Sequence, residues 1–205
     1  MQESNLDKKL FLVVLGGRTS SSHIELHDVR WVIGEGIQET FPQLRKEWFG
    51  LAQGLHIDSY LEIRFVDGYQ VLIEKTKFIK STSSAKTFLS KGFSGQNLLW
   101  FVNLGGYDPN QMNELHEFGL VVAKTAKEAS DLARKRYLKD VLHKHKDDIS
   151  LVCSIKSIDH CNPINDLGDW SITLIPDPKL RSQSLRPDWY GYLRIDDQIQ
   201  KEIVF

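Results

Sequence analysis

The chain contains one stretch twice, and this internal repeat constrains its fold more than any other feature. The first copy, in residues 10–33, reads LFLVVLGG, a polar turn and ELHDVRWVI; the second, in residues 99–122, reads LWFVNLGG, a polar turn and ELHEFGLVV. The copies align without a gap at a separation of 89 positions, as from Leu15 to Leu104. Two copies are too few for a solenoid, which needs about three or more repeats to cover its faces. The repeat therefore predicts a tandem duplication of one folding unit.

The first copy predicts the order of elements in that unit. Residues 10–15 are apolar at every position, which is typical of a central strand with both faces covered. Residues 25–33 alternate as a second strand, on which Glu25 and His27 share a face with apolar residues. A helix should follow, with Thr40 as N-cap and Pro42 in its first turn. Residues 56–66 and 69–74 then form two strands around an Asp67-Gly68 hairpin turn.

The second copy follows the same order and differs at its hairpin. Thr125-Ala-Lys-Glu128 reads as a capping box that starts a helix, which we expect to continue to about His143. Residues 149–155 and 170–175 should be the matching hairpin strands, joined by a long loop. Residues 189–195 could add one strand more.

These elements predict an α+β fold. It consists of two β-β-α-β-β units related by a pseudo-twofold, with mixed or antiparallel sheets and one helix packed on each unit. The predicted limits are 1–80 for the first repeat, 81–97 for a linker, 98–178 for the second repeat and 179–205 for a C-terminal extension.

Composition excludes several classes of partner. A net charge of −1 gives no support for binding nucleic acid or an anionic membrane surface. No stretch approaches the roughly 20 apolar residues of a membrane span. Only two cysteines are present, which is typical of a reducing compartment, so a cytoplasmic protein is expected. A homo-oligomer or another protein stays open as partner.

The repeated Glu-x-His pairs are the first candidate site. Glu25 and His27, and likewise Glu114 and His116, should project from the same face of a strand, and a carboxylate beside an imidazole can serve acid–base chemistry or ligand binding. His23 extends the first pair. The alternative is that each pair only satisfies the polar groups of the fold. The spacing matches no metal signature, so no metal ligand and no cofactor is assigned.

Two further patterns are weaker. Gly16-Gly17 with Arg18 could approach an anion, although glycines that supply a positive-φ turn explain the pair better. His56 and His145 also lie 89 positions apart, each followed two residues later by Asp. We interpret this second repeat as a structural junction between loop and strand.

The motifs LGGR…SHIELHDVRWVIG and TFPQLRKEWFG resemble a small bacterial family catalogued as domain of unknown function 1543, whose members carry one or two copies of the domain. The resemblance covers residues 10–74 well and residues 99–175 more loosely, with Tyr107 in place of Arg18. It implies no activity, so it assigns no functional residue.

Two functions therefore stay open. The first is a non-enzymatic module that binds a small molecule or a protein, since no complete catalytic signature is present. The second is a hydrolase-like enzyme or metal-binding protein that uses the Glu-x-His pairs where the two repeats meet.

Overall fold

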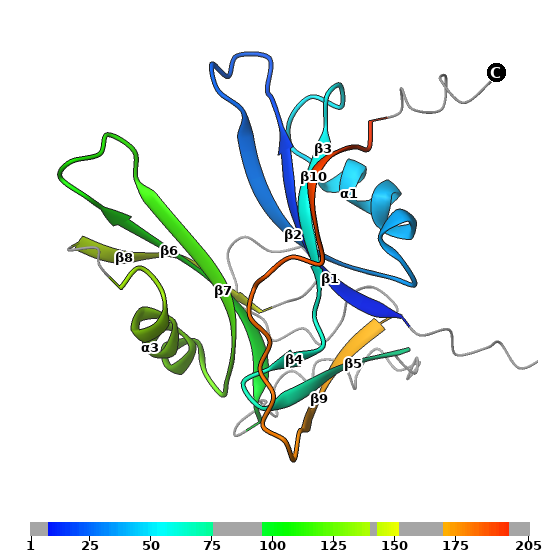
Figure 1. The fold of residues 1–205 in the computed structure, drawn as a ribbon, viewed down its shortest axis with the longest axis vertical. Helices are drawn as coiled ribbons and strands as arrows, with labels where there is room; N and C mark the ends of the chain where they lie inside the picture. Colours follow the sequence, from blue (N-terminus) through cyan, green and yellow to red (C-terminus); the bar gives the residue numbers. More distant parts are fainter. Residues whose placement is uncertain (1–7, 76–95, 140–142, 152–169, 197–205) are drawn as a thin grey trace, which may run out of the picture. The chain divides into compact units, whose positions relative to one another are not determined.

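A computed structural model describes residues 8–75, 96–139, 143–151 and 170–196, with only the backbone considered in 143–151. These residues have the predicted α+β fold, with antiparallel strand pairing and short helices (Figure 1). The chain divides into two compact units. Unit 1 comprises residues 1–64 and 183–205, and unit 2 comprises residues 65–182. No helix of the described residues has the length and apolar character needed to cross a membrane.

Unit 1 is built on a four-stranded sheet in the order β10-β3-β1-β2. The apolar strand β1 lies between β2 and β3, which confirms its predicted central position. The C-terminal strand β10 pairs with β3, so the last described segment of the chain completes the sheet of the first repeat. The strand bounds are β1 Lys9–Gly17, β2 Leu26–Gly34, β3 His56–Glu62 and β10 Trp189–Arg194.

One face of this sheet is covered by a short helical segment. The 3-10 helix η1 (Ile37–Thr40) runs into α1 (Phe41–Glu47), with Thr40 as N-cap and a proline in the first turn, as predicted. The Thr40 hydroxyl does not cap α1, because it donates to the Ile37 carbonyl at 2.6 Å. The core between the sheet and the helices consists of buried residues from the strands, the helices and the segments next to them: Phe11, Val13, Leu15, Val32, Ile37, Leu44, Trp48, Leu55, Ile57 and Ile195.

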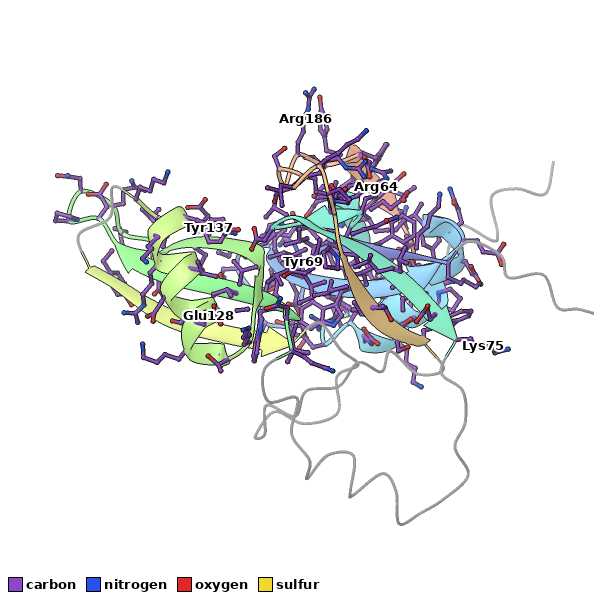
Figure 2. All side chains as sticks on the ribbon, turned by 90° about the horizontal axis from the view of Figure 1, so that it is seen from below. Arg64, Tyr69, Lys75, Glu128, Tyr137 and Arg186 are labelled. Carbon is purple, nitrogen blue, oxygen red and sulfur yellow. The ribbon has the colours of Figure 1, made fainter. Side chains whose placement is uncertain are left out.

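Unit 2 repeats this arrangement with a three-stranded sheet in the order β7-β6-β8. Its helix α3 begins with the predicted capping box, in which Thr125 Oγ1 accepts from the Glu128 N–H at 3.2 Å. The Glu128 carboxylate in turn accepts from the Lys124 N–H at 2.9 Å. Figure 2 labels Glu128 on the green helix α3. The bounds are β6 Leu98–Tyr107, β7 Leu115–Ala123, α3 Ala126–Arg136 and β8 His143–Leu151.

The predicted continuation of α3 to about His143 is wrong. The helix ends at Arg136, because Tyr137 is extended (φ −107°, ψ 155°) and Leu138 has a φ of 48°. Residue 143 instead begins β8. The basic side chains at the end of α3 suit the negative end of the helix dipole, and they do not prolong the helix.

A second sheet in unit 2, in the order β4-β5-β9, joins strands from both repeats. Its hairpin turn is Asp67-Gly68, with φ of 51° and 80°, as predicted. Residues 149–151 of the expected strand 149–155 belong to β8, and β9 pairs along its whole length with β5, so the described residues show no pairing of 149–151 with 170–175. Residues 152–155 and the predicted loop 156–169 lie outside the described residues. The bounds are β4 Phe65–Val66, β5 Tyr69–Lys75 and β9 Trp170–Pro176.

Asp67 fastens this hairpin to the rest of unit 2. Its carboxylate accepts from the Val122 N–H at 2.9 Å and from Arg136 Nη1 at 2.7 Å, so the turn is held to β7 and to the end of α3. The compact units thus divide the chain differently from the sequence copies. The repeat limits at residues 80, 98 and 178 stay predictions.

Candidate functional site

The glycine pair of β1 leaves room for two rings. Neither Gly16 nor Gly17 has a positive φ and both belong to the strand, so the predicted turn is wrong. A Cβ on Gly16 would lie 2.4 Å from His56 Nε2, and a Cβ on Gly17 would lie 2.7 Å from Trp48 Cζ2. Because successive residues of a strand face opposite sides, one ring lies on each face of the sheet.

Two histidines flank Gly16 on the neighbouring strands. The register pairs Gly16 with His27 of β2 and with His56 of β3, and directly paired residues of antiparallel strands share a face. This is the face opposite α1, because the core under the helix takes Leu26 and Val32 from β2. The predicted apolar neighbours of His27 are therefore only half-buried, while Val32 on the other face is fully buried.

Two carboxylates complete what we call the acid–imidazole cluster: Glu25, His27, His56 and Asp58. His56 Nε2 lies 3.2 Å from Asp58 Oδ1 and 3.4 Å from Glu25 Oε1. His27 Nε2 lies 3.3 Å from Asp58 Oδ2 and 3.8 Å from Glu25 Oε2. Asp58 reaches this position because the register of β1 and β3 shifts at Val14/Leu15, which leaves Asp58 as an extra residue in β3. Each imidazole therefore faces both carboxylates.

The two imidazoles differ in exposure. The side chain of His56 is 1% exposed and that of His27 is 54% exposed. Glu25, at 40%, is also open to solvent. The Tyr192 ring lies over His56 with a centroid separation of 4.0 Å. The cluster is thus a fixed, buried imidazole beneath an accessible acid–imidazole pair.

The C-terminal strand holds His56 in place. The Gly54 carbonyl lies 2.8 Å from His56 Nδ1, and the Gly54 N–H donates to Asp196 Oδ2 at 2.9 Å. Asp196 is buried and accepts two hydrogen bonds from Arg194, at 2.8 and 3.2 Å. The Arg194 guanidinium, together with the Gly54 N–H, holds the pKa of the Asp196 carboxyl below its usual value.

The predicted pairs take different places in the two units. Glu25 and His27 join the cluster of unit 1, whereas Glu114 and His116 lie in unit 2, where Glu114 Oε2 is 3.6 Å from His116 Nε2. A site shared by both pairs stays a prediction. Arg18 and His23 are exposed in the connection between β1 and β2, and the contacts that build the cluster come from other residues. In the part of the chain that the structure describes, no group of three or more His, Cys, Asp or Glu is placed to hold a metal ion.

Sequence analysis missed three members of the site: His56, Asp58 and Tyr192. The repeated His-x-Asp pattern was the signal for the first two, since it has the same 89-residue separation as the Glu-x-His pairs. It indicates a site only once the register places His56 beside Gly16. Tyr192 belongs to a segment outside both repeats, so no repeat signal points to it.

Comparisons with known proteins agree with this architecture. The model of a family described as Domain of Unknown Function (DUF1543) matches residues 22–73 and again residues 111–162. The crystal structure of a protein Il1583 from Idiomarina loihiensis is similar, with 30% sequence identity, a TM-score of 0.63, and coverage of 92% of this chain and 99% of that one. No curated protein matches. The chain therefore belongs to the DUF1543 family and carries two copies of its domain.

Proposed function

We propose that the chain is a non-enzymatic binding module that holds a small organic cation at the acid–imidazole cluster of unit 1. The observation that carries this proposal is a convergence of hydrogen-bond acceptors. A carbonyl oxygen only accepts, so the Gly54 carbonyl requires a proton on His56 Nδ1. In a neutral His56, Nε2 is then a bare acceptor that faces two carboxylate oxygens.

Such a convergence needs a positive charge. One source is a second proton on His56, which makes an imidazolium that can donate to Asp58 Oδ1 or Glu25 Oε1. The other is a cationic ligand that reaches the exposed carboxylate of Glu25 and leaves His56 neutral. A primary ammonium suits the site, since it offers three donors and a compact charge. The Tyr192 ring supplies an aromatic surface beside the cluster.

The test is an NMR titration of the full chain with propylammonium at pH 8, with sodium acetate as the anionic counterpart. We expect saturable shifts of the His27 and His56 imidazole signals with propylammonium and none with acetate. Glu25→Gln should weaken binding at least tenfold. Glu35→Gln, which changes a carboxylate paired with Lys8, is the matched control. Equal responses to both probes, or no response to either, would contradict the proposal.

A hydrolase-like enzyme is the second candidate, and one observation favours it. His27 is half-exposed and lies within ion-pair distance of two carboxylates, which is the pairing that supports a general base. Two measurements decide between the binding module and the enzyme. One is metal analysis of untagged protein, and the other is ester hydrolysis by the wild type, His27→Ala and His116→Ala. Turnover that His27→Ala abolishes in a folded protein would favour the enzyme. A cytoplasmic location belongs to both candidates and is supported by the low cysteine content.

A further inference from the structure

We propose that unit 2 carries a second site of the same class, so that one chain binds two organic cations with different affinities. This inference rests on the proposed function of unit 1. It starts from the register of β6, in which Gly105 is paired with His116 of β7 and with His145 of β8. The register of unit 1 pairs Gly16 with His27 and His56 in the same way.

The strand irregularity is repeated as well. The pairing of β6 with β8 shifts between Asn103 and Leu104, and this leaves Asp147 as the extra residue of β8. In unit 1 the shift occurs 89 positions earlier and leaves Asp58. The register thus places an acidic residue at the bulge of both strands. The acid–imidazole pair on β7 also matches, with 3.6 Å between Glu114 and His116.

The residues around the glycine, the two histidines and the two acids differ between the two units, whereas these five are the same in both. Packing alone therefore does not explain why they recur. On the helix face, Trp48 and Arg30 of unit 1 are replaced by Tyr137 and Gly119, and the Tyr137 ring occupies the space that a Cβ on Gly119 would fill. At the end of β6, Tyr107 stands in place of Arg18. The glycine, the two histidines and the two acids keep both identity and spacing: Gly105, Glu114, His116, His145 and Asp147.

Among the described residues, the second site has no counterpart of strand β10. In unit 1, β10 pairs with β3 and supplies the Tyr192 ring over His56, and Asp196, which follows β10, accepts from the Gly54 N–H. Within the described residues, β8 pairs with β6 alone and forms an edge of its sheet. A strand with one neighbour is less restrained than a strand with two, so more ordering of its backbone is required upon binding. We therefore assign the lower affinity to unit 2.

The inference is tested on the full chain by NMR titration with propylammonium at pH 8. The titration follows the imidazole signals of the four histidines in the two sites: His27, His56, His116 and His145. We expect two saturating steps: His27 and His56 respond first, and His116 and His145 respond at a concentration several-fold higher. Glu25→Gln should remove the first step and leave the second, Glu114→Gln should do the reverse, and Glu35→Gln should change neither. His116→Gln replaces Glu114→Gln if the latter fails to fold.

The outcomes separate this inference from the proposed function. A single step that Glu25→Gln abolishes, with His116 and His145 unmoved, would overturn the second site and leave the function of unit 1 intact. No step at any histidine would overturn both. Two steps that respond separately to Glu25→Gln and Glu114→Gln would support both.

Discussion

A glycine inside a strand lets a neighbouring ring approach the backbone, and this is the use that the chain makes of Gly16. The strand gives up some stability for it, since glycine has a larger backbone entropy in the unfolded chain. In return the His56 imidazole lies against the backbone of β1, with both carboxylates of the cluster near its Nε2. Gly16 is therefore part of the site although it has no side chain.

Gly16→Ala should destabilise unit 1. A Cβ there would meet the ring of a buried histidine at 2.4 and 2.8 Å, and overpacking of this kind costs about 1–3 kcal/mol. Urea denaturation measures the loss, and the His56 imidazole signals should shift in the native state. Gly36→Ala is the control, because its Cβ would meet only the end of a flexible side chain at 3.4 Å, and it should cost about 0.5 kcal/mol or less. Equal losses in the two variants would contradict a steric role for Gly16.

Asp196→Asn should remove a pH-dependent part of the stability of unit 1. The folded-state pKa of Asp196 is depressed, so its contribution is fully present above the unfolded value of about 3.9 and is lost as pH falls through the folded value. At pH 7 the variant should lose about 1.5–3 kcal/mol, the range for a hydrogen-bonded charge. The difference from wild type should shrink toward pH 3 in denaturation curves. Glu35→Gln, on the surface, should show little change. A constant difference from pH 7 to pH 3 would refute the role.

Most of the strands could be predicted from sequence, and most of the site could not. Alternation and the repeat locate the strands and show that Glu25 and His27 share a face. They do not reveal which strand lies next to which, and the cluster exists only because β3 brings His56 beside Gly16. The bulge at Asp58 has no sequence signature that could place its carboxylate. In the sequence, the pattern around His56 is the same for a buried histidine of a site as for a structural junction between loop and strand.

At the scale of elements, the two helices start by different means. In α3 the Thr125 side chain accepts the Glu128 N–H, whereas in α1 the Thr40 hydroxyl donates to a carbonyl and the preceding 3-10 turn leads into the helix. The sequence predicts the N-cap residues of both helices, because Ser and Thr are favoured at the N-cap position. It cannot distinguish the two uses, since these depend on the direction from which the chain enters the helix.

Thr125→Ala should therefore weaken unit 2 by about 1 kcal/mol, the usual cost of losing an N-cap side chain. Thermal or urea unfolding measures this loss, and Thr125→Ser should restore most of it. Lys127→Ala, one turn into the helix with an 86% exposed side chain, is the control and should have little effect. A loss with Lys127→Ala as large as that with Thr125→Ala would argue against the cap.

For the whole molecule, the duplication and the compact units follow different boundaries. The chain leaves unit 1 after residue 64, forms all of unit 2, and returns at residue 183. The hairpin strand β5 comes from the first predicted repeat but pairs with β9 of the second. The tail likewise returns to the sheet of the first copy. Repeats in a sequence reveal common ancestry of two segments, and they do not fix which segments exchange strands.

This exchange predicts which fragment folds alone. A fragment of residues 65–182 contains every strand described in unit 2, together with the Asp67 hydrogen bonds to Val122 and Arg136. A fragment of residues 98–178, cut at the predicted repeat limits, lacks β5 and leaves the hydrogen-bonding groups of β9 without their partner strand. We expect cooperative thermal unfolding and dispersed amide signals for 65–182. For 98–178 we expect a lower melting temperature or aggregation, because β9 then presents an unpaired edge. If 98–178 is as stable as 65–182, the pairing of β5 with β9 contributes little, and the repeat is the folding unit after all.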